Sequence, residues 1–262
     1  FGVPFDGSCA TCHRNGVVEQ EITIVEGRRN GTDTSYYPSG CPFSSQSFLL
    51  GQPHGISKTY FDSTNRVKSI IEHYMGSVNG AFITFDLNGD TLKLQDYEAN
   101  LPNGVKKEYY TASVLKKITH YKMGLLHGCQ TKYSENGNKQ LAISYFEGKK
   151  DNVWTYYFDN QEIARIEGWD KGIKEGSFIT YNATGTIINE KYYKKGKPIG
   201  IHKEFYLDGR KKHTMFYSKK GVIEEEYAFD DYGVKQIIKQ RETKAMRKKK
   251  RKGKEEDNSL MN

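Results

Sequence analysis

Aromatic residues and glycines recur along this chain with a period of about twenty-four residues. The repeated units begin at Gly31, Gly55, Gly80, Gly104, Gly128, Asn152, Gly176, Gly200 and Glu224. An aromatic residue follows five positions after each of these, at Tyr36, Tyr60, Phe85, Tyr109, Tyr133, Tyr157, Tyr181, Phe205 and Phe229. A second aromatic follows later in most units, at Phe48, Tyr97, Tyr121, Tyr145, Trp169, Tyr193 and Tyr217. Such internal repetition is typical of an array in which each unit packs against its neighbours.

The order of apolar and polar positions within a unit predicts two β-strands. The residue directly after the first glycine is mostly apolar, the fifth is aromatic, and the second and fourth are more often polar. A strand alternates its side chains with period two, so we expect the first and fifth positions on one face. Turn sequences such as DLNG, NATG and YLDG supply the residues that hairpins need at positive φ. The pattern predicts an all-β protein, an elongated, twisted antiparallel meander of about nine β-hairpin repeats.

The repeat pattern divides the chain into three segments. Residues 1–15 form a short N-terminal arm, residues 16–238 form the hairpin array, and residues 239–262 have lost the pattern. The array opens on a half repeat, Val17–Arg29, as the terminal units of repeat arrays often do. The last segment begins with good helix formers and ends in polar residues, which predicts a helical and then disordered tail.

Basic charge is concentrated in this tail. The chain carries a net charge of +8, and residues 239–262 hold ten Lys and Arg against four Asp and Glu, so the remainder is nearly neutral. The basic cluster consists of Arg247, Lys248, Lys249, Lys250, Arg251 and Lys252. It suits an anionic lipid, a membrane surface or an acidic partner, and it is equally explained as a solvated tail. Nucleic acid is not the expected partner, and no apolar run is long enough to span a membrane.

The most unusual local motif is Cys9-Ala10-Thr11-Cys12-His13. It matches the attachment signature of c-type haem, in which Cys9 and Cys12 would bind the vinyl groups and His13 would ligate the iron. The context does not favour haem, because a strand pattern rather than a helix begins after the motif. The preferred interpretation is a local disulfide or a pair of free thiols. Half of a zinc site is the third and least favoured interpretation, because the sequence has no second Cys-x-x-Cys to complete it.

These alternatives bear on cofactor and location. We expect no cofactor, with haem c as the alternative. A functional, oxidised motif would place the protein outside the cytoplasm, in the periplasm, secreted or at a membrane surface. A cytoplasmic location is the alternative.

Two classes of aromatic position predict two roles. The rings at the fifth position are expected to pack across strands and hold the sheet together. Rings outside this register are expected to be more exposed and are the candidate contacts with a partner. They are Phe82, Trp154, Tyr156, Phe178 and Tyr206. The sequence has no nucleophile elbow, phosphate-binding glycine loop, paired catalytic carboxylates or HExxH motif, so an enzyme is not expected.

The repeated glycines and aromatics resemble the membrane occupation and recognition nexus (MORN) repeat. The similarity is closer to the degenerate variant of about twenty-four residues found in proteins labelled YwqK-type antitoxins. The residues that carry it are the pairs Asn30-Gly31, Asn79-Gly80, Asn103-Gly104, His54-Gly55 and His127-Gly128, the aromatic positions, and Gly40, Gly89, Gly137, Gly185 and Gly209. It covers Gly16 to about Gly233, with departures at Asn152, Ser113, Gln161 and Glu224.

The resemblance implies an elongated twisted sheet of successive hairpins, a protein-binding or lipid-binding scaffold, and no catalytic residues. We therefore expect a non-catalytic protein-interaction scaffold, a subunit or accessory factor of a larger assembly, with membrane association of that assembly as one option. A haem-bearing electron-transfer subunit and an antitoxin or immunity-type binding protein are the alternatives.

Overall fold

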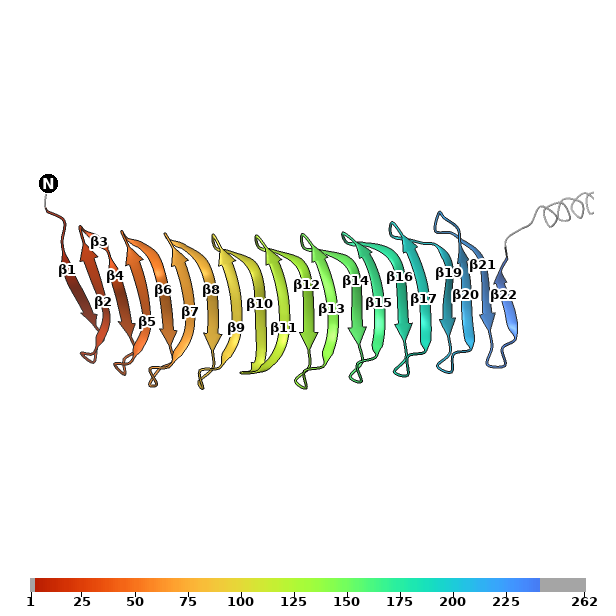
Figure 1. The fold of residues 1–262 in the computed structure, drawn as a ribbon, viewed down its shortest axis with the longest axis horizontal. Coiled ribbons are helices and arrows are strands. Elements are labelled where there is room, and N and C mark those ends of the chain that lie inside the picture. The colour runs from red at the N-terminus through yellow and green to blue at the C-terminus, as the bar shows by residue number, and fades with distance from the viewer. Residues whose placement is uncertain (1–2, 241–262) are drawn as a thin grey trace, which may run out of the picture. The chain divides into compact units, whose positions relative to one another are not determined.

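The computed structural model describes residues 3–240 of the chain. Within these residues it consists of strands and turns without helix, which confirms the all-β prediction (Figure 1). The chain divides into two compact units, unit 1 at Phe1–Asn152 and unit 2 at Val153–Asn262. No helix among the described residues has the length and apolar character needed to cross a membrane.

The strands follow one another as hairpins. Unit 1 contains β1 (Gly7–Cys12), β2 (Val18–Val25), β3 (Arg28–Arg29), β4 (Gly31–Tyr36), β5 (Pro42–Leu49), β6 (Gln52–Tyr60), β7 (Val67–Tyr74), β8 (Ser77–Phe85), β9 (Thr91–Glu98), β10 (Leu101–Thr111), β11 (Val114–Lys122), β12 (Leu125–Tyr133) and β13 (Lys139–Phe146). The strand β14 (Lys149–Tyr157) includes the boundary between the units. Unit 2 contains β15 (Ile163–Asp170), β16 (Ile173–Tyr181), β17 (Ile187–Lys194), β18 (Lys197–Pro198), β19 (Gly200–Phe205), β20 (Lys211–Tyr217), β21 (Ile223–Phe229) and β22 (Lys235–Lys239).

In each unit, neighbouring strands pair antiparallel with the strands that precede and follow them in sequence. β7 pairs with β6 and β8, for example, and β20 pairs with β19 and β21. The short pair β3 and β4 together occupy the place of one strand beside β2, as β18 and β19 do beside β17. The predicted hairpin meander is therefore confirmed.

The segment predicted as an N-terminal arm contains a strand of the sheet. β1 pairs with β2 in a register that runs from Gly7 opposite Ile24 to Cys12 opposite Val18. Its two cysteines thus lie on the first strand of unit 1 rather than on an arm ahead of it. At the other end the last described strand, β22, ends at Lys239, and the basic cluster at residues 247–252 lies outside the described residues.

Two kinds of turn alternate along each meander. One kind is a tight two-residue connection in which both residues have positive φ, as at Met75 (45°) and Gly76 (85°). This conformation matches the right-handed twist of the strands that it joins. The other kind is closed by an aspartate or asparagine, as where the Asp86 carboxylate accepts bonds from the Asn88 and Asp90 amides at 2.8 and 2.9 Å. Turn chemistry therefore fixes both ends of the hairpins.

The unit-starting glycine and the second aromatic of the same unit are cross-strand partners. The pairs are Gly31 and Phe48, Gly80 and Tyr97, Gly104 and Tyr121, Gly128 and Tyr145, Gly176 and Tyr193, and Gly200 and Tyr217. A glycine in a strand leaves a gap that a ring on the facing strand can cover. Asn152, which replaces the glycine in one unit, keeps the left-handed backbone with φ of 57°.

At the start of each sequence repeat, the face of the strand that is buried differs from the predicted one. The second residue after the unit start is buried in four units, at Asp33, Ser57, Trp154 and His202. The first residue after the unit start is largely exposed, at 48% for Ile56, 56% for Val153 and 40% for Ile201. The prediction places the first and fifth positions on one face, whereas here the second position is the buried one and the first is exposed at Ile56, Val153 and Ile201.

A local bulge explains this difference. Between Ile71 and His73 the register of β7 with β8 shifts, just where the left-handed Gly80 occurs. The Ala81 amide that follows donates to the Glu72 carboxylate at 3.2 Å instead of joining the regular ladder. A second register shift, between Thr84 and Phe85 in the pairing of β8 with β9, lies between the first and fifth positions, so period-two counting fails along the strand.

Candidate binding groove

An open apolar groove lies on unit 1 beside the turn after β8. Its volume is about 680 Å³. The residues that line it are Phe61, Lys68, Ser69, Phe82, Thr84, Phe85, Asp86, Leu87, Asn88 and Leu92. They come from the end of one hairpin and the whole turn of the next, so the repeat packing itself creates the groove.

Strand register places the floor of the groove. Phe82 and Thr84 are two residues apart on β8 and share a face, and Ser69 on β7 lies opposite Thr84. The Phe82 ring contacts Tyr97 at a centroid separation of 6.4 Å. Lysines border the rings, with Lys93 Nζ lying 5.1 Å from the Phe82 centroid. The groove therefore combines an apolar floor with a basic border.

The turn that forms one wall is held on a fixed backbone. The Asp86 carboxylate binds two amides of its own turn, as described above, and Arg66 of the preceding turn donates a hydrogen bond to the Leu87 carbonyl. The Leu87 side chain is 53% exposed at the tip. An exposed leucine on a rigid turn presents apolar surface to a partner at little cost in conformational entropy.

Unit 2 has a smaller groove at equivalent repeat positions. Its volume is about 390 Å³, and it is lined by Thr180, Ile188, Asn189, Glu204, Phe205, Tyr206, Leu207 and Lys212. The equivalence follows from register, since Ser69 lies opposite Thr84 in unit 1 and Asn189 lies opposite Glu204 in unit 2. Charged residues replace apolar or neutral ones here, with Glu204 at the place of Thr84 and Lys212 at the place of Leu92.

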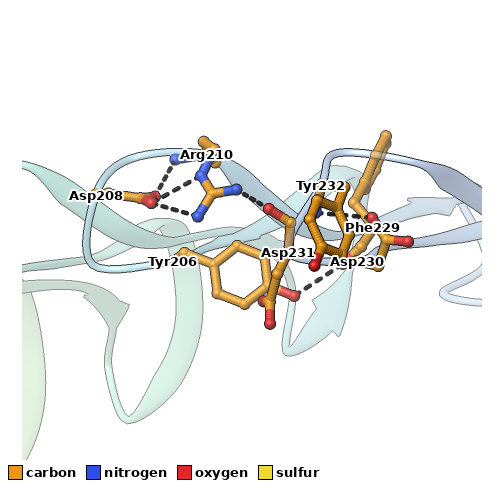
Figure 2. Close-up of polar contacts among 7 residues, drawn as sticks. All are labelled: Tyr206, Asp208, Arg210, Phe229, Asp230, Asp231 and Tyr232. Carbon is orange, nitrogen blue, oxygen red and sulfur yellow. Dashed lines mark hydrogen bonds and ion pairs between the residues drawn. The ribbon is translucent and has the colours of Figure 1, made fainter.

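The turn of this second groove is clamped to the next turn (Figure 2). The Tyr206 hydroxyl donates to the Phe229 carbonyl at 2.9 Å, and Arg210 bonds both the Asp208 carboxylate and the Asp231 carbonyl. The hydrogen bond from Arg210 lowers the pKa of Asp208 below 3.8. The same tyrosine clamp occurs in unit 1, where Tyr37 donates to the Tyr60 carbonyl at 3.0 Å. Tyr206 therefore links two hairpins as well as lining a groove.

Of the five rings predicted as partner contacts, two line grooves. Phe82 forms the floor of the groove in unit 1, and Tyr206 lies in the groove of unit 2. Tyr156 is half-buried, with the Arg165 guanidinium 4.1 Å from its ring centroid. Trp154 is only 5% exposed, so the expectation of an exposed ring is wrong at this position. It occupies the second position after the unit start, which the bulge turns inward.

Trp154 belongs to an unbroken row of ring contacts in unit 2. Successive centroid distances are 6.3 Å for Trp154 and Trp169, 5.5 Å for Trp169 and Phe178, 4.9 Å for Phe178 and Tyr193, 5.5 Å for Tyr193 and His202, and 4.4 Å for His202 and Tyr217. We call these six side chains the aromatic row. Phe178, predicted as a partner contact, is a member, so packing between strands accounts for its position.

His202 is the histidine of the aromatic row. It is 1% exposed, and its Nε2 lies 2.8 Å from the Tyr192 carbonyl oxygen. Burial lowers the pKa of His202 below 6.5 because it disfavours the imidazolium. The neutral imidazole is therefore the form that the fold holds.

The cysteine motif lies apart from both grooves, on β1 and the residue after it. Cys9 and Cys12 are exposed free thiols, and His13 Nε2 lies 2.9 Å from the Tyr36 carbonyl oxygen. On the extended strand β1 the Cα atoms of two cysteines three residues apart are separated by about 10 Å, whereas a covalent haem needs both thiols on one porphyrin edge. In this conformation the three residues do not fit a haem. Within residues 3–240, no cluster of three or more His, Cys, Asp or Glu side chains is placed to hold a metal ion.

Sequence reasoning missed most of the groove in unit 1. Phe61, Lys68, Leu87 and Leu92 were not among the candidates. One signal for them exists, since DLNG and YLDG carry a leucine at the turn tip where other units have polar or small residues. The leucine is the sequence feature that sets these two turns apart from the others.

Comparison with known proteins gives a short match. A family model described as a MORN repeat variant matches residues 126–146, which supports a MORN-type repeat protein. No curated protein matches the chain.

Two solved structures resemble the chain only distantly. The Tc holotoxin pore of Photorhabdus luminescens is 12% identical over 84% of this chain and 15% of its own, with a TM-score of 0.21. A complex of TcdB2, TccC3 and Cdc42 is 10% identical over 88% of this chain and 14% of its own, with a TM-score of 0.19. The chain thus spans about a seventh of each, and TM-scores this low do not establish a shared fold.

Proposed function

We propose that this protein is a non-catalytic scaffold that binds another protein, and that the groove beside Leu87 receives an apolar side chain of that partner. The observation that carries the proposal is the groove itself, about 680 Å³ of open space floored by Phe61, Phe82, Phe85 and Leu92. A preformed apolar pocket with a few polar groups at its border is the usual form of a recognition site. The MORN-type repeat supports the same class of function.

The border of the groove indicates the chemistry of the partner. Lys68 and Lys93 lie over the Phe61 and Phe82 rings at 5.8 and 5.1 Å, while Asp86 is occupied by its own turn. A partner side chain that enters here meets two ammonium groups at the border. We therefore propose an apolar residue flanked by a carboxylate, because opposite charges at a rim steer association and fix orientation.

The proposal leaves wider context as prediction. Membership of a larger assembly, attachment through the basic cluster at residues 247–252 and an extracytoplasmic location remain expectations from the sequence. The groove does not depend on them, since the residues that build it come from one segment, 61–92.

Co-purification with matched variants tests the proposal. Tagged full-length protein is expressed in cells that make it, as wild type, as Leu87→Glu and as Leu207→Glu, and bound proteins are quantified by mass spectrometry. We expect the amount of one bound protein to fall at least about tenfold with Leu87→Glu and to stay unchanged with Leu207→Glu. Both leucines are more than half exposed, at 53% and 76%, so folding is preserved in both. Equal retention of every bound protein by the three forms would refute the groove as a binding site.

A further inference from the structure

Cys9 and Cys12 form a pair of exposed thiols on the first strand of the sheet. Among the described residues β1 pairs with β2 alone, and its six residues are exposed. The groove does not involve these cysteines. Their chemistry is therefore open to a separate role.

The strand conformation keeps the two sulfurs apart. Three steps of about 3.3 Å separate the two Cα atoms by about 10 Å, and the register of β1 with β2 shifts between Thr11 and Cys12. A disulfide requires Cα atoms no more than about 7 Å apart and Cβ atoms that face one another. A Cys9–Cys12 disulfide and a paired β1 thus exclude each other.

A small set of contacts holds β1 in place. Beyond the ladder with β2, the Gly27 amide donates to the Phe5 carbonyl at 3.0 Å, and the Asp6 carboxylate accepts from the Glu26 amide. At the other end the His13 amide donates to Val17, and the His13 ring bonds the Tyr36 carbonyl at 2.9 Å. These contacts are exposed or half-buried, and opening one edge strand breaks no core packing.

We propose that Cys9 and Cys12 are a thiol–disulfide site, and that forming their disulfide releases β1 from β2. The oxidant is a small-molecule disulfide such as oxidised glutathione. One cysteine thiolate attacks it, forms a mixed disulfide and expels one thiolate. The other cysteine thiolate then attacks the mixed disulfide and expels the second. Two protein thiols become one disulfide, and the two glutathione thiolates that leave take up the two protons, so one glutathione disulfide becomes two thiols.

Release of β1 uncovers the edge of β2. The newly exposed strand offers unpaired amide and carbonyl groups together with Val18, Ile22 and Ile24, which are half-buried while β1 is paired. A free edge of this kind accepts a further strand from another chain. The redox state of the two cysteines therefore controls whether the N-terminal edge of the sheet is closed or available.

The coupling is reciprocal, which supplies a second readout. If the disulfide weakens β1 pairing, then anything that weakens β1 pairing favours the disulfide by the same factor. His13→Ala removes the bond to the Tyr36 carbonyl without touching either thiol. We expect it to raise the equilibrium constant for disulfide formation by about fivefold, the size of one half-buried hydrogen bond.

The test equilibrates the full-length protein in mixtures of reduced and oxidised glutathione. Free thiols are then blocked, peptide mass spectrometry locates each disulfide, and hydrogen exchange is measured on matched reduced and oxidised samples. Peptide mapping separates this pair from Cys41 and Cys129. Cys12→Ser is the matched control, because its Cys9 can form a mixed disulfide but no internal one.

The expected result is a Cys9–Cys12 disulfide that accelerates exchange of the β1 and β2 amides at least about tenfold and leaves β5 to β13 unchanged. Cys12→Ser keeps the slow exchange at every glutathione ratio, and His13→Ala shifts the midpoint toward more reducing mixtures. A disulfide with unchanged exchange in β1 and β2 would overturn the proposal. Mixed disulfides at both cysteines without an internal disulfide at any ratio would overturn it equally.

Discussion

Units 1 and 2 place their apolar side chains differently, although the same repeat builds both. In unit 2 the second position of the repeat is occupied by Trp154, Phe178 and His202, which are members of the aromatic row, and by Glu226 in the last repeat. In most repeats of unit 1 the same position is polar, with Asp33, Ser57, Lys106 and Gln130. The grooves show the reverse, since the groove of unit 1 is apolar and that of unit 2 carries Glu204 and Lys212.

This difference separates two uses of apolar surface. Rings that contact one another between strands stabilise the sheet, because they remove each other from water. Rings and leucines left around an open groove gain that energy only when a partner covers them. The repeat fixes the backbone and the positions, and substitution at those positions decides where apolar side chains pack between strands and where they line an open groove.

The largest expected effect is on the stability of unit 2. Trp154→Ala should lower the free energy of unfolding by about 3 kcal/mol, because it removes a buried ring and interrupts the aromatic row. Ser57→Ala at the equivalent position of unit 1 should cost less than about 1 kcal/mol. Denaturant unfolding followed by hydrogen exchange in each unit measures both, and equal costs would contradict the distinction between the units.

The next largest effect is expected when the charges of the groove of unit 2 are placed in the groove of unit 1. Thr84→Glu with Leu92→Lys gives the groove of unit 1 the charges of unit 2. We expect partner affinity to fall at least about tenfold, because a glutamate at the floor of the groove must lose its hydration when the partner covers it. The free energy of unfolding should change by less than about 1 kcal/mol, since both sites are partly exposed. Retained binding in the transplanted protein would show that the floor of the groove is not the contact.

The aromatic row should also make unit 2 sensitive to acid. The pKa of His202 is lowered below 6.5 by burial, so below that pH the unfolded chain binds more protons than the folded one. The contribution of the neutral His202 imidazole to the free energy of unfolding is fully present above about pH 6.5. It is lost as the pH falls toward the pKa of His202 in the folded protein, and the free energy of unfolding then changes by at most about 1.4 kcal/mol per pH unit. His202→Gln should flatten this slope in unfolding measured from pH 7 to 5. An unchanged slope would exclude His202 as its source.

The smallest effect should be the same in both units. Tyr206→Phe and Tyr37→Phe each remove a hydroxyl that donates to the carbonyl of the next unit, at 2.9 and 3.0 Å. Each should lower the free energy of unfolding by about 1 kcal/mol. Thermal unfolding of the two variants compares them directly. A clear difference would mean that this clamp is not a shared device.

Sequence reasoning reached the fold because the repeat is a backbone pattern. Glycines with positive φ and the aromatics across from them recur whatever the partner is, and they specify hairpins on their own. Face assignment failed at one point for a physical reason. The register shifts between Thr84 and Phe85, just before the fifth position, and such a bulge changes the alternation that period-two counting relies on.

The site was harder to predict because it is made by neighbouring repeats. Phe82 was found as an off-register ring, but Phe61 and Leu92 become neighbours only when two hairpins pack side by side. The cysteine motif was found from spacing alone, whereas its role depends on the strand that contains it. Spacing along the chain does not reveal an extended conformation that keeps the Cα atoms of the two cysteines about 10 Å apart.

Site-directed photo-crosslinking tests the central claim, that the groove of unit 1 binds a partner, most directly. A photoreactive residue replaces Asn88 at the border of the groove in one form and Asp208 at the equivalent position of unit 2 in another, and both are illuminated in cells that make the protein. The account predicts one discrete adduct at position 88 that disappears with Leu87→Glu, and none of that mass at position 208. The same adduct at both positions, or an adduct at 88 that survives Leu87→Glu, would contradict it.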